Sequence, residues 1–144
     1  GTVGKRLVSI GIENTEENRR QFRELFYTAP GIGQYISGAI MFHETIYQST
    51  SVTGTPVSFV QTLKAQNILT GIKLDKGLKP IPGYPQETYT EGLDGLADRV
   101  KAYYEQGARF AKWRSVLKID PRQGLPSEVA IEQNAVGLAQ YAAI

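Results

Sequence analysis

Apolar residues recur along this chain with two different periods, which predict alternating helices and strands. Helical spacing of apolar side chains predicts four helices, in the stretches 14–29, 55–67, 93–107 and 127–144, and a short helix is expected before them. Continuous or alternating apolar runs predict three strands, which are Tyr35 to Phe42, Leu69 to Lys76 and Phe110 to Lys118. The stretch from Gly77 to Gly92 is rich in Pro, Gly, Thr and Tyr and is expected to form a long loop.

Capping residues set the expected helix ends. A loop is expected before the first short helix, which should end near Gly11. N-caps are expected at Asn14, at Thr55 (after a polar loop containing Gly54) and at Ser127. Gly107 is expected to close the fourth helix, because glycine readily takes the left-handed conformation that ends helices.

The order of the elements predicts an α/β fold with parallel strands. Ile36, Ile72 and Phe110 mark three strands at similar intervals, each followed by a helix. Such alternation gives parallel strands joined by right-handed crossovers. The strand covering 35–42 should be buried on both faces, since it is almost entirely apolar. Three strands alone fit either an open doubly wound sheet or an arc of an eight-stranded barrel.

Composition excludes several classes of protein. Of the 144 residues, 41% are hydrophobic and 21% are charged, as in ordinary globular domains and unlike disordered or membrane-spanning chains. The net charge of +2 does not indicate a nucleic-acid partner. Cysteine is absent and histidine occurs once, so thiolate and histidine-rich metal sites are not expected. A glycine at the start and a helical isoleucine at the end suggest a piece of something longer.

Charged residues lie at the carboxyl ends of two predicted strands, where parallel α/β folds place their reactive groups. Lys73 and Asp75 share one face of their strand, and Lys112 and Arg114 share a face of theirs, because residues two apart point the same way. If these faces meet, two lysines and one arginine converge with one carboxylate. Such a cluster suits a phosphate or a developing oxyanion. The alternative is a strand end with solvated charges.

Other charged residues carry weaker signals. The three arginines at 19, 20 and 23 are expected to form a solvated helix face, although a substrate phosphate could recruit one of them. His43 follows the first strand and is interpreted as a structural residue that makes hydrogen bonds. Ile72 and Leu74 should be buried, since they lie on the strand face opposite Lys73.

Five sequence stretches resemble class I fructose-bisphosphate aldolase. They are Gly4 to Leu7, Ser9 to Arg20, Gly71 to Gly77, Gly92 to Leu96 and Phe110 to Arg114. The resemblance implies a (β/α)8 TIM barrel, of which residues 1–144 would be part of a single domain. It would cover the second to fourth βα units, about three parallel strands with their helices, without the first strand and the C-terminal half.

The resemblance also implies an activity, which is reversible cleavage of fructose 1,6-bisphosphate to dihydroxyacetone phosphate and glyceraldehyde 3-phosphate through a lysine Schiff base. Lys112, Lys73 and Asp75 match the catalytic positions on the family's third and fourth strands. Matches to substrate-binding positions are Lys5, Arg6, Arg19, Lys73, Lys112 and Arg114. No metal or cofactor is implied.

By the same resemblance, the Schiff-base lysine, the glutamate pair and the first-strand aspartate lie outside these residues. The 144 residues alone are therefore expected to be inactive, and their open sheet edges favour aggregation. The family implies a cytoplasmic homotetramer, with a plastid as the alternative location. Actin or other acidic proteins are implied partners, and nucleic acid and membranes are not. The alternative function is a non-catalytic module that binds phosphosugars or acidic proteins with the same basic pocket.

Overall fold

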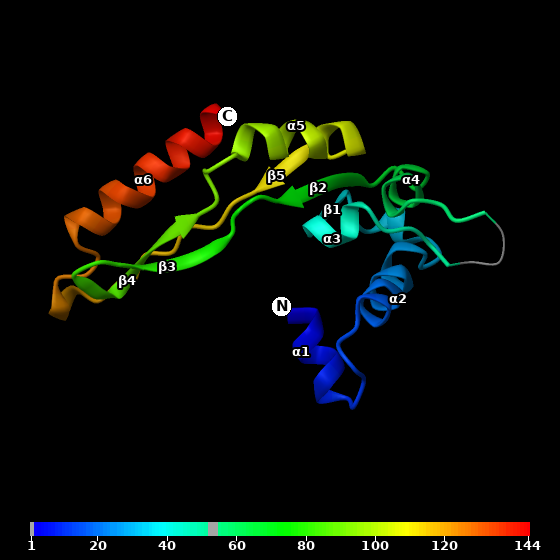
Figure 1. Ribbon diagram of the computed structural model, residues 1–144, viewed down its shortest axis with the longest axis horizontal. Helices are drawn as coiled ribbons and strands as arrows, with labels where there is room; N and C mark the ends of the chain where they lie inside the picture. Colours follow the sequence, from blue (N-terminus) through cyan, green and yellow to red (C-terminus); the bar gives the residue numbers. More distant parts are fainter. Residues whose placement is uncertain (1, 52–54) are drawn as a thin grey trace. The chain divides into compact units, whose positions relative to one another are not determined.

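The computed structural model describes residues 2–51 and 55–144, so the expected loop residue Gly54 lies outside the described residues (Figure 1). The chain divides into two compact units. The first contains the residues up to Ile72 together with Glu105–Phe110, and the second contains Lys73–Tyr104 and Ala111–Ile144.

The observed elements alternate much as predicted. From the N-terminus to the second strand they are α1 (Thr2–Ser9), α2 (Glu16–Tyr27), the 3-10 helix η1 (Ile32–Gln34), β1 (Gly38–Met41), α3 (His43–Ile46), α4 (Phe59–Lys64) and β2 (Leu69–Lys73). The remaining elements are β3 (Gly77–Ile81), β4 (Tyr84–Glu91), α5 (Leu96–Gln106), β5 (Phe110–Lys112), the 3-10 helix η2 (Pro121–Gln123) and α6 (Glu128–Ala143).

The three predicted strands form one sheet in the order β1-β2-β5. Strands β1 and β2 are parallel, with Gly38 opposite Leu69 and Met41 opposite Ile72. All three strands are shorter than predicted, and β2 ends at Lys73 rather than at Lys76. The backbone N–H of Ile36 donates to the Ile32 carbonyl, so β1 starts only after that turn. Strand β5 ends at Lys112, whereas the prediction extended it to Lys118.

Burial follows the predicted faces in β2 and departs from them in β1. Ile72 and Leu74 are buried, as predicted. In β1 and just after it, Met41 is buried but Ile40 and Phe42 are about half exposed. The prediction that this strand is covered on both faces is therefore wrong for the described residues, because only one face is packed against them.

Residues 77–91 form a β-hairpin, and the prediction of a long loop is wrong. Strands β3 and β4 pair antiparallel, with Gly77 opposite Glu91. A two-residue turn joins them, and its Gly83 has φ +82°. Proline followed by a left-handed glycine is a favourable turn sequence. The prolines within the two strands had argued against pairing, but a bulge at Pro80 and Ile81 accommodates the irregular register.

Two predicted N-caps are displaced along the chain. The hydroxyl of Thr15, not the side chain of Asn14, accepts the N–H of Asn18 at 3.1 Å. The hydroxyl of Ser58, not Thr55, accepts the N–H of Gln61 at 3.2 Å. A hydrogen bond from Thr50 N–H to the Val57 carbonyl keeps the chain extended up to that point, which delays the helix.

Other helix ends agree better with prediction. The Ser127 hydroxyl accepts the N–H of Ala130 at 3.2 Å, as expected of an N-cap. Gly107, with φ +110°, follows the end of α5. The first helix ends near Gly11 as predicted, but it starts at Thr2, so the loop expected before it is absent from the described residues.

Helix α6 packs through a face that does not carry its largest apolar side chains. The residues that it buries are Ala130 and Asn134, and the Asn134 amide donates to the Thr88 carbonyl of β4 at 2.9 Å. Figure 1 shows α6 running alongside the hairpin. Ile131 and Leu138, which lie at helical spacing on another face, are 46% and 40% exposed. This helix face packs against the hairpin, which was not predicted from the sequence.

Candidate active site

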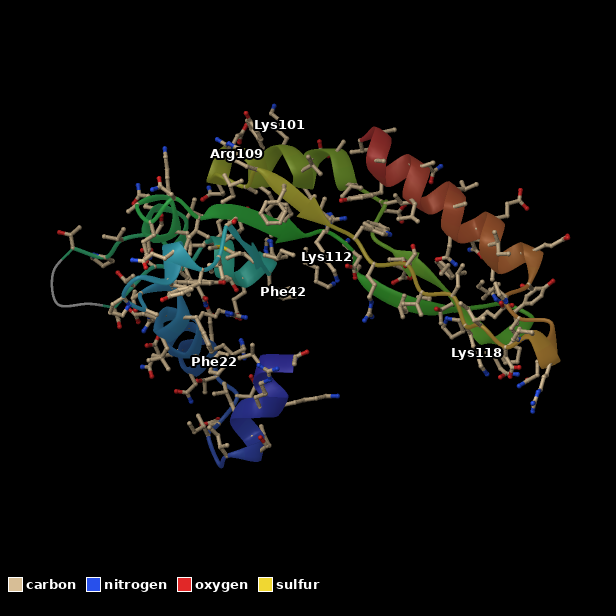
Figure 2. All side chains as sticks on the ribbon, turned by 180° about the vertical axis from the view of Figure 1, so that it is seen from behind. Phe22, Phe42, Lys101, Arg109, Lys112 and Lys118 are labelled. Atoms are coloured by element: carbon tan, nitrogen blue, oxygen red, sulfur yellow. The ribbon has the colours of Figure 1, made fainter. Side chains whose placement is uncertain are left out.

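Two lysines from neighbouring strand ends meet at one buried carboxylate. The Nζ of Lys73 lies 2.7 Å from Oδ1 of Asp75, and the Nζ of Lys112 lies 3.9 Å from Oδ2. The Asp75 side chain is 2% exposed, whereas those of Lys73 and Lys112 are 33% and 36% exposed. The carboxylate therefore forms the floor of the cluster, and both ammonium groups face solvent in part. Figure 2 shows Lys112 at the carboxyl end of β5.

The two lysines are held differently. The Lys73 ammonium donates to both the backbone oxygen and Oδ1 of Asp75, each at 2.7 Å. At 3.9 Å, Lys112 forms an ion pair but no hydrogen bond with Oδ2, and that buried oxygen has no hydrogen-bond partner among the described residues. Lys73 is thus fixed by its neighbour, while the donors of Lys112 remain available to a bound molecule.

Backbone contacts bring the two strand ends together. The N–H of Leu74 donates to the carbonyl of Lys112 at 3.0 Å. The guanidinium of Arg99 on α5 donates to the Leu74 carbonyl at 3.1 Å and also to the Gly92 carbonyl. The residue between Lys73 and Asp75 is therefore tied on one side to β5 and on the other to α5. These contacts keep the carboxylate between the two ammonium groups.

Arg114 does not join this cluster through an ion pair. Strand β5 has ended before Arg114, and its side chain is exposed. Among the described residues its guanidinium has no hydrogen bond or ion pair, and its backbone carbonyl accepts the Thr90 hydroxyl at 2.7 Å. Of the four residues predicted to converge, the structure brings together Lys73, Asp75 and Lys112.

The arginines of α2 are paired with carboxylates and are not the solvated face that was predicted. Arg19 makes two hydrogen bonds to Glu44, of 3.0 and 2.6 Å, and Arg23 makes one of 2.5 Å. The hydrogen bonds from Arg19, and then that from Arg23, lower the pKa of Glu44 to about 2 although partial burial opposes the shift. Arg20 pairs with Glu24 at 2.6 Å. The position of Arg19 is thus set by Glu44.

The other residues singled out from the sequence also lie in the first unit, and they are Lys5, Arg6 and His43. Lys5 and Arg6 are exposed on α1. The ring of His43 packs edge-on against Tyr47, with centroids 5.2 Å apart, in keeping with a structural role. In the described part of the chain no three acidic or histidine side chains gather as a metal site would require. No helix there is long and apolar enough to cross a bilayer.

A cavity of about 740 Å³ lies elsewhere in the second unit, between β4, the segment after β5 and α6. Thr90, Trp113 and Asn134 line it, and none of the four predicted charged residues does. Two buried polar atoms in its wall, Nε1 of Trp113 and Oδ1 of Asn134, have no hydrogen-bond partner among the described residues. The ionisable cluster is thus separate from this cavity, and we place the candidate chemistry at the cluster.

Sequence reasoning missed several residues that contact the predicted site residues or the segments that carry them. Thr90 was assigned to a loop, although its place in a run of alternating threonine and tyrosine residues is typical of a strand. Arg99 lies among the apolar residues of a helical face, and no sequence signal marks it. Glu44 lies just past the first predicted strand, and its pairing with Arg19 was not predicted.

Comparison with known proteins places this geometry in a family. A model of the class-I fructose-bisphosphate aldolase family matches residues 1–144. The chain is 56% identical to fructose-bisphosphate aldolase 1 of Toxoplasma gondii over 144 residues, which is 100% of this chain and 39% of that protein. It is 59% identical to a chloroplastic fructose-bisphosphate aldolase of Oryza sativa, covering 99% of this chain and 35% of that protein.

The fold comparison agrees. A solved fructose-bisphosphate aldolase from Plasmodium falciparum, in complex with TRAP and a small-molecule inhibitor, matches 98% of this chain and 40% of its own, with a TM-score of 0.92 and 50% identity. The protein belongs to the class I fructose-bisphosphate aldolase family. Its fold is part of a (β/α)8 barrel, so the barrel and not the open sheet is the correct alternative.

Proposed function

We propose that this chain supplies the lysine-rich part of the active site of a class I fructose-bisphosphate aldolase. The reaction would be the reversible cleavage of fructose 1,6-bisphosphate to dihydroxyacetone phosphate and glyceraldehyde 3-phosphate through a lysine Schiff base. Family membership supports this activity, and the chain spans between a third and two fifths of the length of the relatives described above. The full activity belongs to the full-length protein.

The observation that carries the proposal is the placing of the buried Asp75 carboxylate between two lysines. Two ammonium groups against one carboxylate leave an excess positive charge, which favours an anionic substrate. Lys73 is already hydrogen-bonded to Asp75, so its role is to set the charge and hold substrate. Lys112 keeps donors free, so its role is to donate to the oxygen that develops charge during carbon–carbon cleavage.

The remaining basic residues are proposed to bind the phosphates. Arg114, with an exposed guanidinium, suits a substrate phosphate because a guanidinium can donate two parallel hydrogen bonds. Lys5 and Arg6 are exposed on α1 and are proposed for the same purpose. Arg19 is a proposed substrate contact as well, in which case its present bonds to Glu44 must be shared with or exchanged for the phosphate.

A borohydride trap tests the activity. The full-length protein is incubated with dihydroxyacetone phosphate and reduced with sodium borohydride, and the adduct is located by peptide mass mapping. Covalent incorporation at a lysine outside residues 1–144 is the expected result. If no adduct forms while substrate binding persists, the protein is a phosphosugar-binding module and the proposed activity is wrong.

Assembly and location are proposed from the family. We propose a homotetramer in the cytoplasm, with the plastid as the alternative, since similar relatives include a cytosolic enzyme of Arabidopsis thaliana (57% identical) and the chloroplastic one of rice (59%). Light scattering of the full-length protein tests the tetramer, and a fluorescent fusion tests the compartment.

A protein-binding role is the second candidate. The observation in its favour is that the Plasmodium falciparum relative is in complex with TRAP, which shows that a protein of this family binds another protein. For this chain we propose an acidic partner, such as actin, that contacts the exposed lysines. Competition between fructose 1,6-bisphosphate and actin in a sedimentation assay tests whether both use the same basic residues. Co-sedimentation unaffected by the sugar would exclude the shared site.

A further inference from the structure

We propose that Thr90 and Tyr141 are positioning residues that hold the segment Lys112–Arg114 in the geometry needed for catalysis. The inference rests on the proposed function of Lys112 and Arg114 and extends it to two residues that touch neither the cluster nor, by this proposal, the substrate. Thr90 contacts the backbone of Arg114, and Tyr141 contacts the side chain of Trp113, which lies between the two cations in the sequence.

Thr90 forms a hydrogen bond with the chain just after the end of β5. The carbonyl of Lys112 accepts the N–H of Leu74, and β5 ends at that residue. Two residues later, the carbonyl of Arg114 accepts a hydrogen bond of 2.7 Å from the hydroxyl of Thr90 on β4. Thr90 is buried, so water does not readily replace this bond. The carbonyl of Arg114 is therefore held by a side-chain hydroxyl, whereas the carbonyl of Lys112 is held by a backbone N–H.

Tyr141 holds the residue between the two cations. The indole of Trp113 stacks on the ring of Tyr141 in α6, with centroids 5.0 Å apart and planes inclined by 27°. On another side the indole packs closely against Gly92, where an added Cβ would lie 3.2 Å from the ring. Gly92 has φ +130° and follows β4, so the indole is confined by the hairpin and by α6.

The consequence for Lys112 follows from chain geometry. In an extended segment the side chain of Trp113 points away from those of its two neighbours. Fixing the indole on one side thus directs Lys112 and Arg114 to the other side. The 3.9 Å separation between Lys112 and Asp75 is an ion pair but too long for a hydrogen bond, so among the described residues of the cluster no hydrogen bond fixes the ammonium. Its place depends on the backbone that carries it.

The test compares isosteric changes in the full-length enzyme. Thr90→Val removes the hydroxyl and keeps the shape, Thr90→Ser keeps the hydroxyl, and Thr88→Val is the matched control two residues away, whose hydroxyl has no hydrogen bond in the described part of the chain. We expect Thr90→Val to lower kcat by about 10- to 100-fold. Thr90→Ser and Thr88→Val should stay within about threefold, because both leave the bond to Arg114 intact.

Tyr141 offers the second comparison. Tyr141→Phe keeps the ring and Tyr141→Leu removes it, so only the leucine variant should lower kcat if stacking positions Trp113. A structural role for the tyrosine hydroxyl predicts instead that phenylalanine also lowers kcat. Equal kcat values for Thr90→Val and Thr88→Val, or for Tyr141→Leu and Tyr141→Phe, would overturn the proposal.

A readout without catalysis separates this inference from the proposed function. Lysines are labelled by reductive ¹³C-methylation, and the Lys112 resonance is assigned by its loss in Lys112→Arg. The chemical shift of this resonance should change in Thr90→Val and Tyr141→Leu and not in their matched controls. If the borohydride trap fails but these shifts occur, the positioning stands and the aldolase activity falls. Should Thr90→Val not fold, the Tyr141 pair decides by the same resonance.

Discussion

The ring of Phe110 on β5 lies against the backbone of Gly71, so closely that a Cβ added to Gly71 would come within 2.4 Å of two ring carbons. The same ring lies near Gly38, where an added Cβ would be 3.0 Å away. Two glycines on β1 and β2 therefore make room for one aromatic side chain from the third strand. The ring occupies the strand face that continues, two residues further on, to Lys73 and Lys112.

Gly71→Ala should destabilise the protein. The methyl group would meet the ring of Phe110, and overpacking of this kind costs about 1–3 kcal/mol. Gly137→Ala is the control, because an added Cβ in that part of α6 meets nothing within 4 Å and alanine favours helix by about 1 kcal/mol. Urea unfolding of the full-length variants should give a lower free energy of unfolding for the first and an equal or higher one for the second.

Lys112→Met should reduce turnover by orders of magnitude with little effect on folding. The substitution removes the ammonium whose donors remain free, while the bond between Lys73 and Asp75 persists. Lys101→Met, at an exposed position of α5, is the control (Figure 2). If the Lys112 variant keeps activity within tenfold, which corresponds to about 1.4 kcal/mol in the barrier, the catalytic role is wrong.

Glu44 should make stability depend on pH in the acid range. Its pKa of about 2 in the folded state lies below the ordinary glutamate value of 4.5, because Arg19 and Arg23 bind the carboxylate. The contribution is fully present above pH 4.5 and disappears as the pH falls towards 2. Glu44→Gln should therefore lower stability at pH 6 and flatten its decline between pH 4.5 and 2. An unchanged slope in urea unfolding against pH would contradict this.

Glu87 should stabilise the start of α6. Its buried carboxylate accepts hydrogen bonds from the N–H and the hydroxyl of Ser127, at 2.8 and 2.5 Å. Loss of bonds to a charged group costs about 1.5–3 kcal/mol. Glu87→Ala should lower the free energy of unfolding by an amount of that order. Glu91→Ala, at the end of the same strand, is a more exposed comparison and should cost less.

Chelators should leave the activity of the full-length enzyme unchanged. The proposed reaction uses lysines and a carboxylate, and the family is the class I aldolase family. Activity is measured after dialysis against EDTA and again after adding zinc. A loss of activity that zinc restores would show that a metal ion takes part.

The sequence predicted the strands because apolar and β-branched runs favour strands whether or not both faces are packed. Ile72 and Leu74 follow a period of two, and this signal survives in any packing of the sheet. The charged positions followed from the same period, since Lys73 and Asp75 had to share the opposite face. The alternation of strands and helices left the barrel and the open sheet equally possible, and the family resemblance made the choice.

Other features depend on contacts between distant residues and could not be predicted in this way. The hairpin pairs strands that contain prolines, and only the pairing itself reveals them as strands. The packed face of α6 does not follow from apolarity, because Ile131 and Leu138 are more apolar than Asn134 and yet are more exposed. Asn134 is buried nevertheless, since its amide reaches the Thr88 carbonyl. The pairing of Arg19 with Glu44 spans 25 residues and has no local signature.

The turn at Pro82 and Gly83 gives this protein a convenient attachment point. Both residues are exposed at the tip of the hairpin, whereas Thr90 lies near its other end. Residues 1–144 contain no cysteine. A cysteine in place of Pro82 would be the single thiol within this segment, and the first turn position tolerates most side chains. A fluorophore or spin label coupled there could report hairpin motion during turnover without chemical modification of the lysines.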